Sequence, residues 1–216
     1  MGRPTDSASS SGIPPREQLL SMALYVEGGL FVSAIALGLL LGVWPLRGNP
    51  WSGSEWAQGV LAMAPMLVLF VVFLLFPVGP LKRIQKTFDE VLLPAFSQLT
   101  PFDALWISLL AGLGEEAFFR GFLQSWLEPM FGPWPALVVA AIMFGLMHLI
   151  TPTYAVIAAL IGGYLGWVYM ATNSLVPPLV AHGLYDFFAL SYLLWFHDSG
   201  RSTSVGEADT PDNDEF

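Results

Sequence analysis

The chain has 216 residues, of which 55% are hydrophobic and only 12% are charged, and its mean hydropathy is +0.62. These values lie outside the usual range of soluble domains, so a lipid bilayer is the first candidate solvent. The absence of cysteine excludes disulfides, thiolate nucleophiles and cysteine metal ligands, and the formal net charge of -9 owes much to five acids in the last ten residues. No nucleic-acid partner is predicted.

The first elements along the chain are a polar tail and two apolar segments. Residues 1–18 are rich in Ser, Pro and Gly and are predicted to form a disordered N-terminal tail. Segments 19–44 and 57–76 each hold about the 20 apolar residues that a helix needs to cross a hydrocarbon core of ~30 Å. Residues 19–80 are therefore predicted to form two accessory transmembrane helices.

The next segment, residues 81–100, is predicted to be an interfacial amphipathic helix. Apolar side chains recur there at helical spacing, opposite a face that carries Lys82, Arg83 and Lys86. Cytoplasmic loops are enriched in Lys and Arg, so these basic residues predict a cytoplasmic loop after two crossings. With an even number of crossings, both termini are then predicted to be cytoplasmic.

The remaining apolar sequence predicts a core of four transmembrane helices within residues 101–196. Its segments are 102–127, 135–150, 154–171 and 175–196. Residues 197–216 are predicted to form a disordered acidic C-terminal tail. The predicted fold class is therefore all-α, a polytopic transmembrane helical bundle with about six spanning helices and one interfacial amphipathic helix.

Ionisable residues inside these predicted spans are the candidates for function. A charged side chain at mid-membrane costs roughly 3 kcal/mol on insertion scales when it faces lipid, so such residues are expected to face inward and to find one another. We expect them to form one buried polar site. The residues are Glu115, Glu116, Arg120, His148, His182 and Asp186.

Helical spacing predicts how several of these residues pair. Glu116 and Arg120 are four residues apart with the acid first, which is the better orientation for an intrahelical ion pair. Glu115 lies about 100° around the helix from Glu116, so it is expected to point elsewhere and to remain free for chemistry. His182 and Asp186 form a second pair of this spacing.

His148 is alone on its segment, one turn after Phe144, whose ring is predicted to shield the site. Both segments are predicted to begin at the outer face of the membrane. Counted from that face at 1.5 Å per residue, His148 lies ~20 Å deep and His182 only ~10 Å deep. A shared site therefore requires tilt, a short re-entrant stretch or shifted helix boundaries. Glu27 and His197 lie near segment ends and are expected to be interfacial, without a role.

Three motifs carry a family resemblance. EEAFFR resembles EExxxR, FGLMH resembles FxxxH, and HGLYD resembles HxxxN/D, in this order on successive predicted membrane helices. Together they resemble the CAAX prenyl endopeptidase and bacteriocin-processing family of intramembrane proteases, and so does the phrase NSLVPPLVAH before the third motif. The resemblance covers about residues 102–196 and leaves out the first two predicted spans.

The resemblance implies a role for each matching residue. Glu115, with His148, would activate the attacking water, while His182 and the residue at Asp186 would stabilise the oxyanion. Glu116 and Arg120 of EEAFFR would then be supporting residues, and Phe144 is also expected to support the site. An Asn at position 186 could donate a hydrogen bond to an oxyanion, whereas an ionised Asp cannot. Asp186 is therefore protonated, orients His182 or ligates a metal.

A metal is left open at this stage. The family includes enzymes described as metalloproteases and enzymes described as glutamate-dependent without a tightly held metal. Two histidines and a carboxylate suit Zn²⁺, although the HExxH spacing is absent. The candidate metal ligands are Glu115, His148, His182 and Asp186, and the alternatives are Zn²⁺ or no metal.

The leading hypothesis is an intramembrane endopeptidase that hydrolyses a peptide bond of a protein or peptide substrate in the lipid bilayer of a prokaryotic cytoplasmic membrane. Two rivals belong to other classes. A non-catalytic scaffold of the same fold would hold a partner protein, and a proton-coupled transporter would use the Glu and His residues as a relay. Loss of proteolysis on replacing Glu115 by Gln discriminates the first hypothesis from both rivals.

Overall fold

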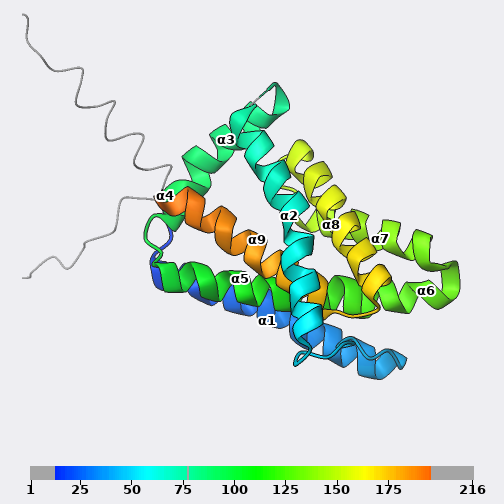
Figure 1. Cartoon of the computed structure of the whole chain (residues 1–216). Helices are drawn as coiled ribbons and strands as arrows, with labels where there is room; N and C mark the ends of the chain where they lie inside the picture. Colours follow the sequence, from blue (N-terminus) through cyan, green and yellow to red (C-terminus); the bar gives the residue numbers. More distant parts are fainter. Residues whose placement is uncertain (1–12, 77, 196–216) are drawn as a thin grey trace, which may run out of the picture.

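The structure is a computed structural model in which residues 13–76 and 78–195 are described. These residues form helices joined by short connections, with no β-strand among them (Figure 1). The predicted all-α class is therefore confirmed. The predicted tail at 197–216 and most of the predicted tail at 1–18 lie outside the described residues.

The first two helices are longer toward their N-terminal ends than the sequence predicted. α1 spans Arg16–Leu41 and ends at Gly42, whose φ of 73° places it in the left-handed region that favours glycine. α2 spans Gly53–Leu75, and the Ser52 hydroxyl caps it by accepting a hydrogen bond from the backbone N–H of Glu55. For α2 the boundary shifts because a cap, and not only apolar residues, decides where the helix begins.

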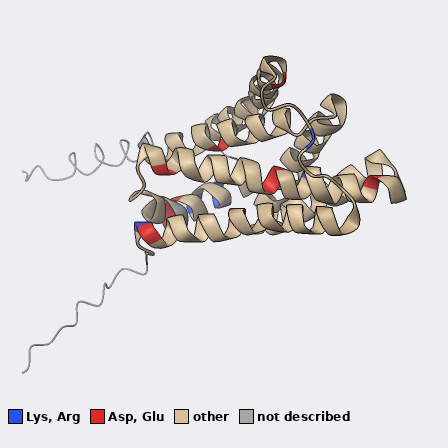
Figure 2. Cartoon of the chain, turned by 90° about the horizontal axis from the view of Figure 1, so that it is seen from below, with Lys and Arg blue, Asp and Glu red and all other residues tan. Residues whose placement is uncertain are grey.

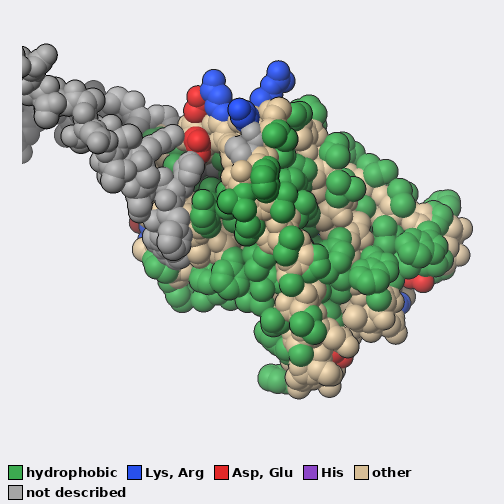
Figure 3. Space-filling model, turned by 45° about the horizontal axis from the view of Figure 1, so that its top comes forward, with side chains coloured by type: hydrophobic (Ala, Val, Ile, Leu, Met, Phe, Trp, Pro, Cys, Tyr) green, Lys and Arg blue, Asp and Glu red, His purple; other side chains and the backbone are tan. Residues whose placement is uncertain are grey.

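The outer surface of the helices is apolar. Leu40 on α1 is 76% exposed and Leu61 on α2 is 73% exposed, and hydrophobic side chains cover most of the face in Figure 3. Acidic and basic residues are sparse along the helices (Figure 2). A surface of this kind suits lipid and not water, because soluble proteins rarely expose large contiguous apolar patches.

Within the described part of the chain, α1, α2 and α8 (Pro152–Thr172) are each long and apolar enough to span a bilayer. The chain is therefore an integral membrane protein built as a helical bundle. The number of six spanning helices, the prokaryotic source and the cytoplasmic placement of the termini stay predictions.

The segment predicted as one amphipathic helix is a run of three pieces. α3 (Pro80–Thr87) continues into a π-helix, η1 (Phe88–Leu92), and then into α4 (Leu93–Phe96). The basic residues of α3 are exposed, and Lys and Arg side chains gather at one end of the molecule in Figure 3. The predicted two-faced character is present in this segment.

The helix that carries the EEAFFR motif changes its winding at that motif. α5 (Pro101–Glu116) runs into a π-helix, η2 (Ala117–Gln124), and then into α6 (Ser125–Phe131). π-Helical stretches are rare and frequently occur at functional sites. A capping box between Thr100 and Asp103 begins α5, and Asp103 also pairs with Arg16 at 2.6 Å, which ties the start of α5 to the start of α1.

The last three helices pack closely against the motif helix and against one another. α7 spans Pro133–Met147 and α9 spans Val176–Trp195. Small residues permit the close contacts, since a Cβ added at Gly145 of α7 would lie 2.5 Å from the Ala155 carbonyl oxygen of α8. α5 lies beside α1 and also packs against α9 (Figure 1). The three family-like motifs therefore come together from α5–η2, the end of α7, and α9.

Candidate active site

An ion pair between Glu116 and Arg120 lies at the centre of the bundle. The Arg120 guanidinium donates from Nη1 to Glu116 Oε1 at 2.6 Å and from Nη2 to the Gly162 carbonyl oxygen at 2.8 Å. Both side chains are essentially inaccessible to solvent. The pair expected from the spacing of four residues is formed, and it joins η2 to α8.

His182 is bonded to the same carboxylate from α9. Its Nδ1 lies 2.8 Å from Glu116 Oε1, and because a carboxylate only accepts, the Nδ1–H of His182 donates. Glu116 Oε1 therefore receives a hydrogen bond from η2 and another from α9. The sequence did not predict this bond, since His182 and Glu116 are 66 residues apart.

His148 lies just past the end of α7, with φ of -99° and ψ of 25°. Its Nδ1 donates to the Phe144 carbonyl oxygen at 2.9 Å, and the Phe144 ring stacks on the imidazole with 4.5 Å between centroids. The same ring lies 4.6 Å from the guanidinium carbon of Arg120. Phe144 thus holds His148 on one side and covers the buried ion pair on the other.

The short length of α7 accounts for the difference in depth expected between the two histidines. A helix of 15 residues rises about 22 Å, less than a hydrocarbon core of ~30 Å. The end that carries His148 therefore need not reach the far surface. His148 and His182 line one cavity as a result.

The Glu115 carboxylate faces both imidazoles at distances longer than hydrogen bonds. Oε1 lies 3.8 Å from His148 Nε2, and Oε2 lies 3.9 Å from His182 Nε2. Oε2 is buried and has no hydrogen-bond partner within residues 13–76 and 78–195. A buried acceptor without a partner is uncommon in proteins and calls for an explanation such as catalysis or a bound water.

Asp186 lies one turn after His182 on α9. Its Oδ2 is 3.4 Å from His182 Nε2, and its side chain is 29% exposed, the most accessible of the site's acids. The two nitrogens of the His182 ring therefore face two different carboxylates, Glu116 and Asp186.

All the residues predicted for the site are brought together, although their roles stay predictions. The four predicted as catalytic contact one another in series, and those predicted as supporting lie behind them. The series runs His148, Glu115, His182 and Asp186, and the supporting residues are Glu116, Arg120 and Phe144.

The donor set is of a kind that binds Zn²⁺, because each histidine is anchored through Nδ1–H and presents Nε2. The spacing does not fit as well. Ligand atoms of a tetrahedral zinc site lie about 3.4 Å apart, whereas Glu115 is 3.8 and 3.9 Å from the two Nε2 atoms. Among the described residues, no group of three or more His, Asp and Glu side chains is arranged so that it could hold a metal ion. A metalloprotease assignment is therefore not supported by this geometry.

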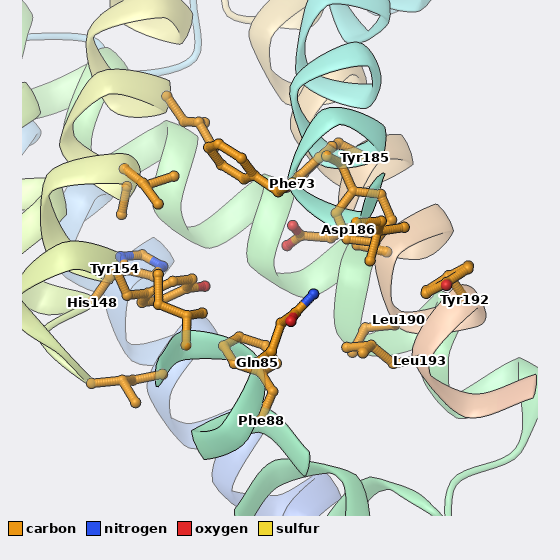
Figure 4. A pocket seen from close by; sticks show the side chains of 18 of the residues that line it. Phe73, Gln85, Phe88, His148, Tyr154, Tyr185, Asp186, Leu190, Tyr192 and Leu193 are labelled. Carbon is orange, nitrogen blue, oxygen red and sulfur yellow. The ribbon is translucent and has the colours of Figure 1, made fainter. Parts of the chain in front are cut away.

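A cavity of about 410 Å³ lies over the site (Figure 4). His148, His182 and Asp186 form part of its wall, while most of the other lining residues are aliphatic or aromatic side chains of α2, α3, α8 and α9. The cavity therefore combines an apolar wall with a small polar floor, as ligand-binding pockets commonly do.

Three residues near the site were missed by the sequence analysis. Glu27 lies near the middle of α1, its backbone carbonyl packs beside Gly114 of α5, and its carboxylate oxygen Oε2 is buried with no partner in the described part of the chain. Gln85 of α3 and Tyr154 of α8 line the cavity. A lone acid near a predicted helix end and two ordinary polar residues outside the motifs gave no signal that could have identified them.

Comparison with known proteins gives one finding. Residues 97–188 match the family model described as type II CAAX prenyl endopeptidase Rce1-like. No curated protein and no solved structure matches the chain. The match covers α5 to α9 as far as the HGLYD motif, and the resemblance stated from the three motifs is confirmed over these residues. α1, α2 and α3 lie outside it.

Proposed function

We propose that this membrane protein hydrolyses a peptide bond with a water activated at Glu115. The match of residues 97–188 to an Rce1-like type II CAAX prenyl endopeptidase model, a family of peptide hydrolases, supports the proposal. The substrate is a protein or peptide that reaches the site from the bilayer.

One observation carries the proposal. Two imidazole Nε2 atoms, one from the end of α7 and one from α9, converge on the carboxylate of Glu115, whose Oε2 has no hydrogen-bond partner among the described residues. Separations of 3.8 and 3.9 Å are too long for direct hydrogen bonds, yet they suit a water molecule bonded to both groups. A base and a water that are held together in this way are the first requirement of hydrolysis.

The hydrogen bond from His148 Nδ1–H to the Phe144 carbonyl fixes the ring so that neutral His148 presents a lone pair at Nε2. Glu115 takes a proton from the water, Nε2 accepts the water's second hydrogen bond, and the water oxygen attacks the substrate carbonyl carbon. Glu115 then returns the proton to the leaving nitrogen as the carbon–nitrogen bond breaks. Water and peptide are thereby consumed to give one carboxyl and one amino terminus.

His182 stabilises the oxyanion. With a proton on each ring nitrogen, His182 donates from Nδ1 to Glu116 and keeps Nε2–H for the developing negative charge. Asp186, 3.4 Å from Nε2, balances the charge of the ring before substrate binds. Of the alternatives for Asp186, the one that orients His182 has this contact in its support.

The Glu115→Gln substitution tests the proposal, because it keeps the shape of the side chain and removes the base. In purified protein reconstituted in lipid, we expect kcat for an internally quenched peptide library to fall about 10²- to 10⁴-fold. Glu90→Gln is a matched control, since Glu90 is exposed and its carboxylate pairs with Lys86 at 3.7 Å on the outer face of the molecule. Hydrolysis that Glu115→Gln left unchanged would disprove the assignment, and unchanged partner assembly without any hydrolysis would favour the scaffold.

A further inference from the structure

One wall of the cavity is formed by α3 and η1. Both elements precede residues 97–188, the segment that matches the family model. These two elements turn one face toward the cavity and the opposite face, with Lys82, Arg83 and Lys86, outward. The cavity-lining residues recur at helical spacing, and they are Leu81, Ile84, Gln85, Phe88 and Asp89. A segment that the sequence suggested only as an interfacial anchor therefore also forms part of the cavity.

Gln85 is the unusual member of this face. Figure 4 shows its amide directed into the middle of the cavity. The side chain is half-buried, and no hydrogen bond to its amide occurs among the described residues. Asp89 and Tyr192, which also line the cavity, each have an interaction of their own. The Gln85 amide is thus a hydrogen-bond donor and acceptor in an apolar wall, and within the described part of the chain it bonds to no other group.

A peptide entering this cavity loses its bonds to water. A buried peptide group without a hydrogen-bond partner is destabilising, and most of the lining side chains have no polar group that could bond to it. A glutamine amide supplies two N–H donors and one carbonyl acceptor, which match the C=O and N–H of an extended peptide. Aliphatic or aromatic residues at this position would leave those groups unsatisfied.

Aromatic contacts connect the wall formed by α3 and η1 to the polar floor of the cavity. The Phe88 ring of η1 lies 5.5 Å from the Tyr154 ring of α8, and Tyr154 lies 6.2 Å from the His148 ring. Gln85 precedes Phe88 by three residues on the same face. The helical segment that carries Gln85 is thus linked through Tyr154 to the side of the cavity that holds His148.

We propose that Gln85 is a substrate-binding residue, which hydrogen-bonds a backbone peptide group of an extended substrate while the scissile carbonyl lies at Glu115. The inference rests on the proposed peptide hydrolysis and adds to it a recognition element in a segment that the family match does not include. Recognition through the backbone is independent of side-chain sequence, so Gln85 affects binding of all substrates alike.

Binding is measured on the Glu115→Gln background, so that it does not depend on turnover. The probe is a fluorescent version of each of the ten library peptides that the Glu115→Gln protein binds most tightly, added to full-length protein in lipid nanodiscs. Gln85→Met keeps the length of the side chain and removes the amide, and we expect it to raise Kd about tenfold for every peptide. In the otherwise wild-type enzyme, it raises KM by the same factor and leaves kcat within about twofold.

Ester analogues identify the bonded group. In each analogue one backbone N–H near the scissile bond is replaced by oxygen, which removes a donor and weakens the adjacent carbonyl as an acceptor. One position is expected to cost about tenfold in Kd in the Glu115→Gln protein and less than twofold when Gln85→Met is also present. Such coupling is not expected from a residue that only packs.

The control is Gln98→Met, because Gln98 is exposed and donates its amide to the Pro14 carbonyl oxygen, away from the cavity. Equal Kd values for Gln85→Met and its parent, additive ester effects, or a library in which nothing binds would each overturn the inference. If the protein with Glu115 intact hydrolysed no peptide while Gln85→Met still weakened peptide binding, the proposed function would be disproved and the role of Gln85 in binding would stand. Thermal unfolding of each variant shows whether it is folded.

Discussion

The two sides of the polar site are built from the same kinds of side chain and differ in how tightly they are bonded. On the inner side, Glu116 Oε1 accepts from Arg120 at 2.6 Å and from His182 at 2.8 Å, and all three side chains are buried. On the cavity side, Glu115 lies 3.8 Å and 3.9 Å from its histidine neighbours. The comparison suggests that the inner side fixes geometry and that the cavity side is free for reaction.

The largest effect that tests this division is expected at Glu116. Glu116→Gln leaves the Arg120 guanidinium buried without its counter-charge, and breaking a buried ion pair by removing one partner costs about 3–5 kcal/mol. We expect the free energy of unfolding in detergent to fall by that amount.

Glu115→Gln serves as the comparison for that measurement, since the neighbouring acid has no direct hydrogen bond to lose. It is expected to reduce hydrolysis while changing the free energy of unfolding by less than about 1 kcal/mol. Equal losses of stability in the two variants would remove the distinction between the two sides.

A smaller effect is expected where α1 supports the motif helix. A Cβ at Gly114 would lie 2.3 Å from the backbone carbonyl oxygen of Glu27, so Gly114→Ala forces α1 and α5 apart. We expect it to destabilise the protein by about 1–3 kcal/mol, as overpacking does, and to lower hydrolysis through displacement of Glu115. Thermal unfolding and kcat measure the two effects.

Gly29→Ala is the matched control in the same helix pair, because a Cβ there meets nothing within 4 Å. It is expected to be neutral or slightly stabilising. If Gly114→Ala behaved in the same way, then α1 would not determine the position of Glu115.

A still smaller effect is expected at Asp186. Asp186→Asn keeps the shape of the side chain and removes the charge beside His182 Nε2, which lies 3.4 Å away. We expect kcat/KM to fall by less than about tenfold, because the amide oxygen can still accept from the ring and its N–H₂ can donate to an oxyanion. Asp186→Leu offers neither group, so a smaller loss for Leu than for Asn would contradict the orienting role.

The smallest effect is expected from metal removal. The spacing of the site's donors does not suit a metal ion, so incubation with a strong chelator is expected to change the rate of hydrolysis by less than about twofold. Elemental analysis of the purified protein accompanies the rate measurement. Inactivation by the chelator with recovery on adding Zn²⁺ would show that the carboxylates and histidines move together around a metal.

Much of the site follows from sequence because burial of charge in lipid leaves few solutions. The ion pair of Glu116 and Arg120 is local to one helix, so spacing alone predicted it. Family resemblance then identified the three helices that meet. What spacing could not predict is contact between helices, such as the bond from His182 to Glu116, since two helices can be rotated in many ways that bury the same residues.

The positions of His148 and Gln85 were unpredictable for other reasons. His148 was expected deep within a helix, but the helix ends at Met147, where no glycine or proline marks a boundary. Gln85 is on the border between the charged and apolar faces of an amphipathic helix, and that pattern alone indicates an interface with lipid. Only the cavity behind the helix distinguishes its inward face from one that lies on a membrane.

The π-helix η2 has a consequence for the comparison of this chain with its relatives. A π-helical turn contains about one more residue than an α-helical turn. Residues that follow it are therefore rotated by about 100° from their positions in an unbroken α-helix. Here that rotation lets the Ser125 hydroxyl meet the Tyr169 hydroxyl at 2.7 Å. A relative whose helix is wound regularly would need one residue fewer between Arg120 and Ser125 to keep both contacts. A single-residue gap at this place in an alignment of related sequences would therefore indicate that the π-helix is replaced by an α-helix, and not that the sequences are misaligned.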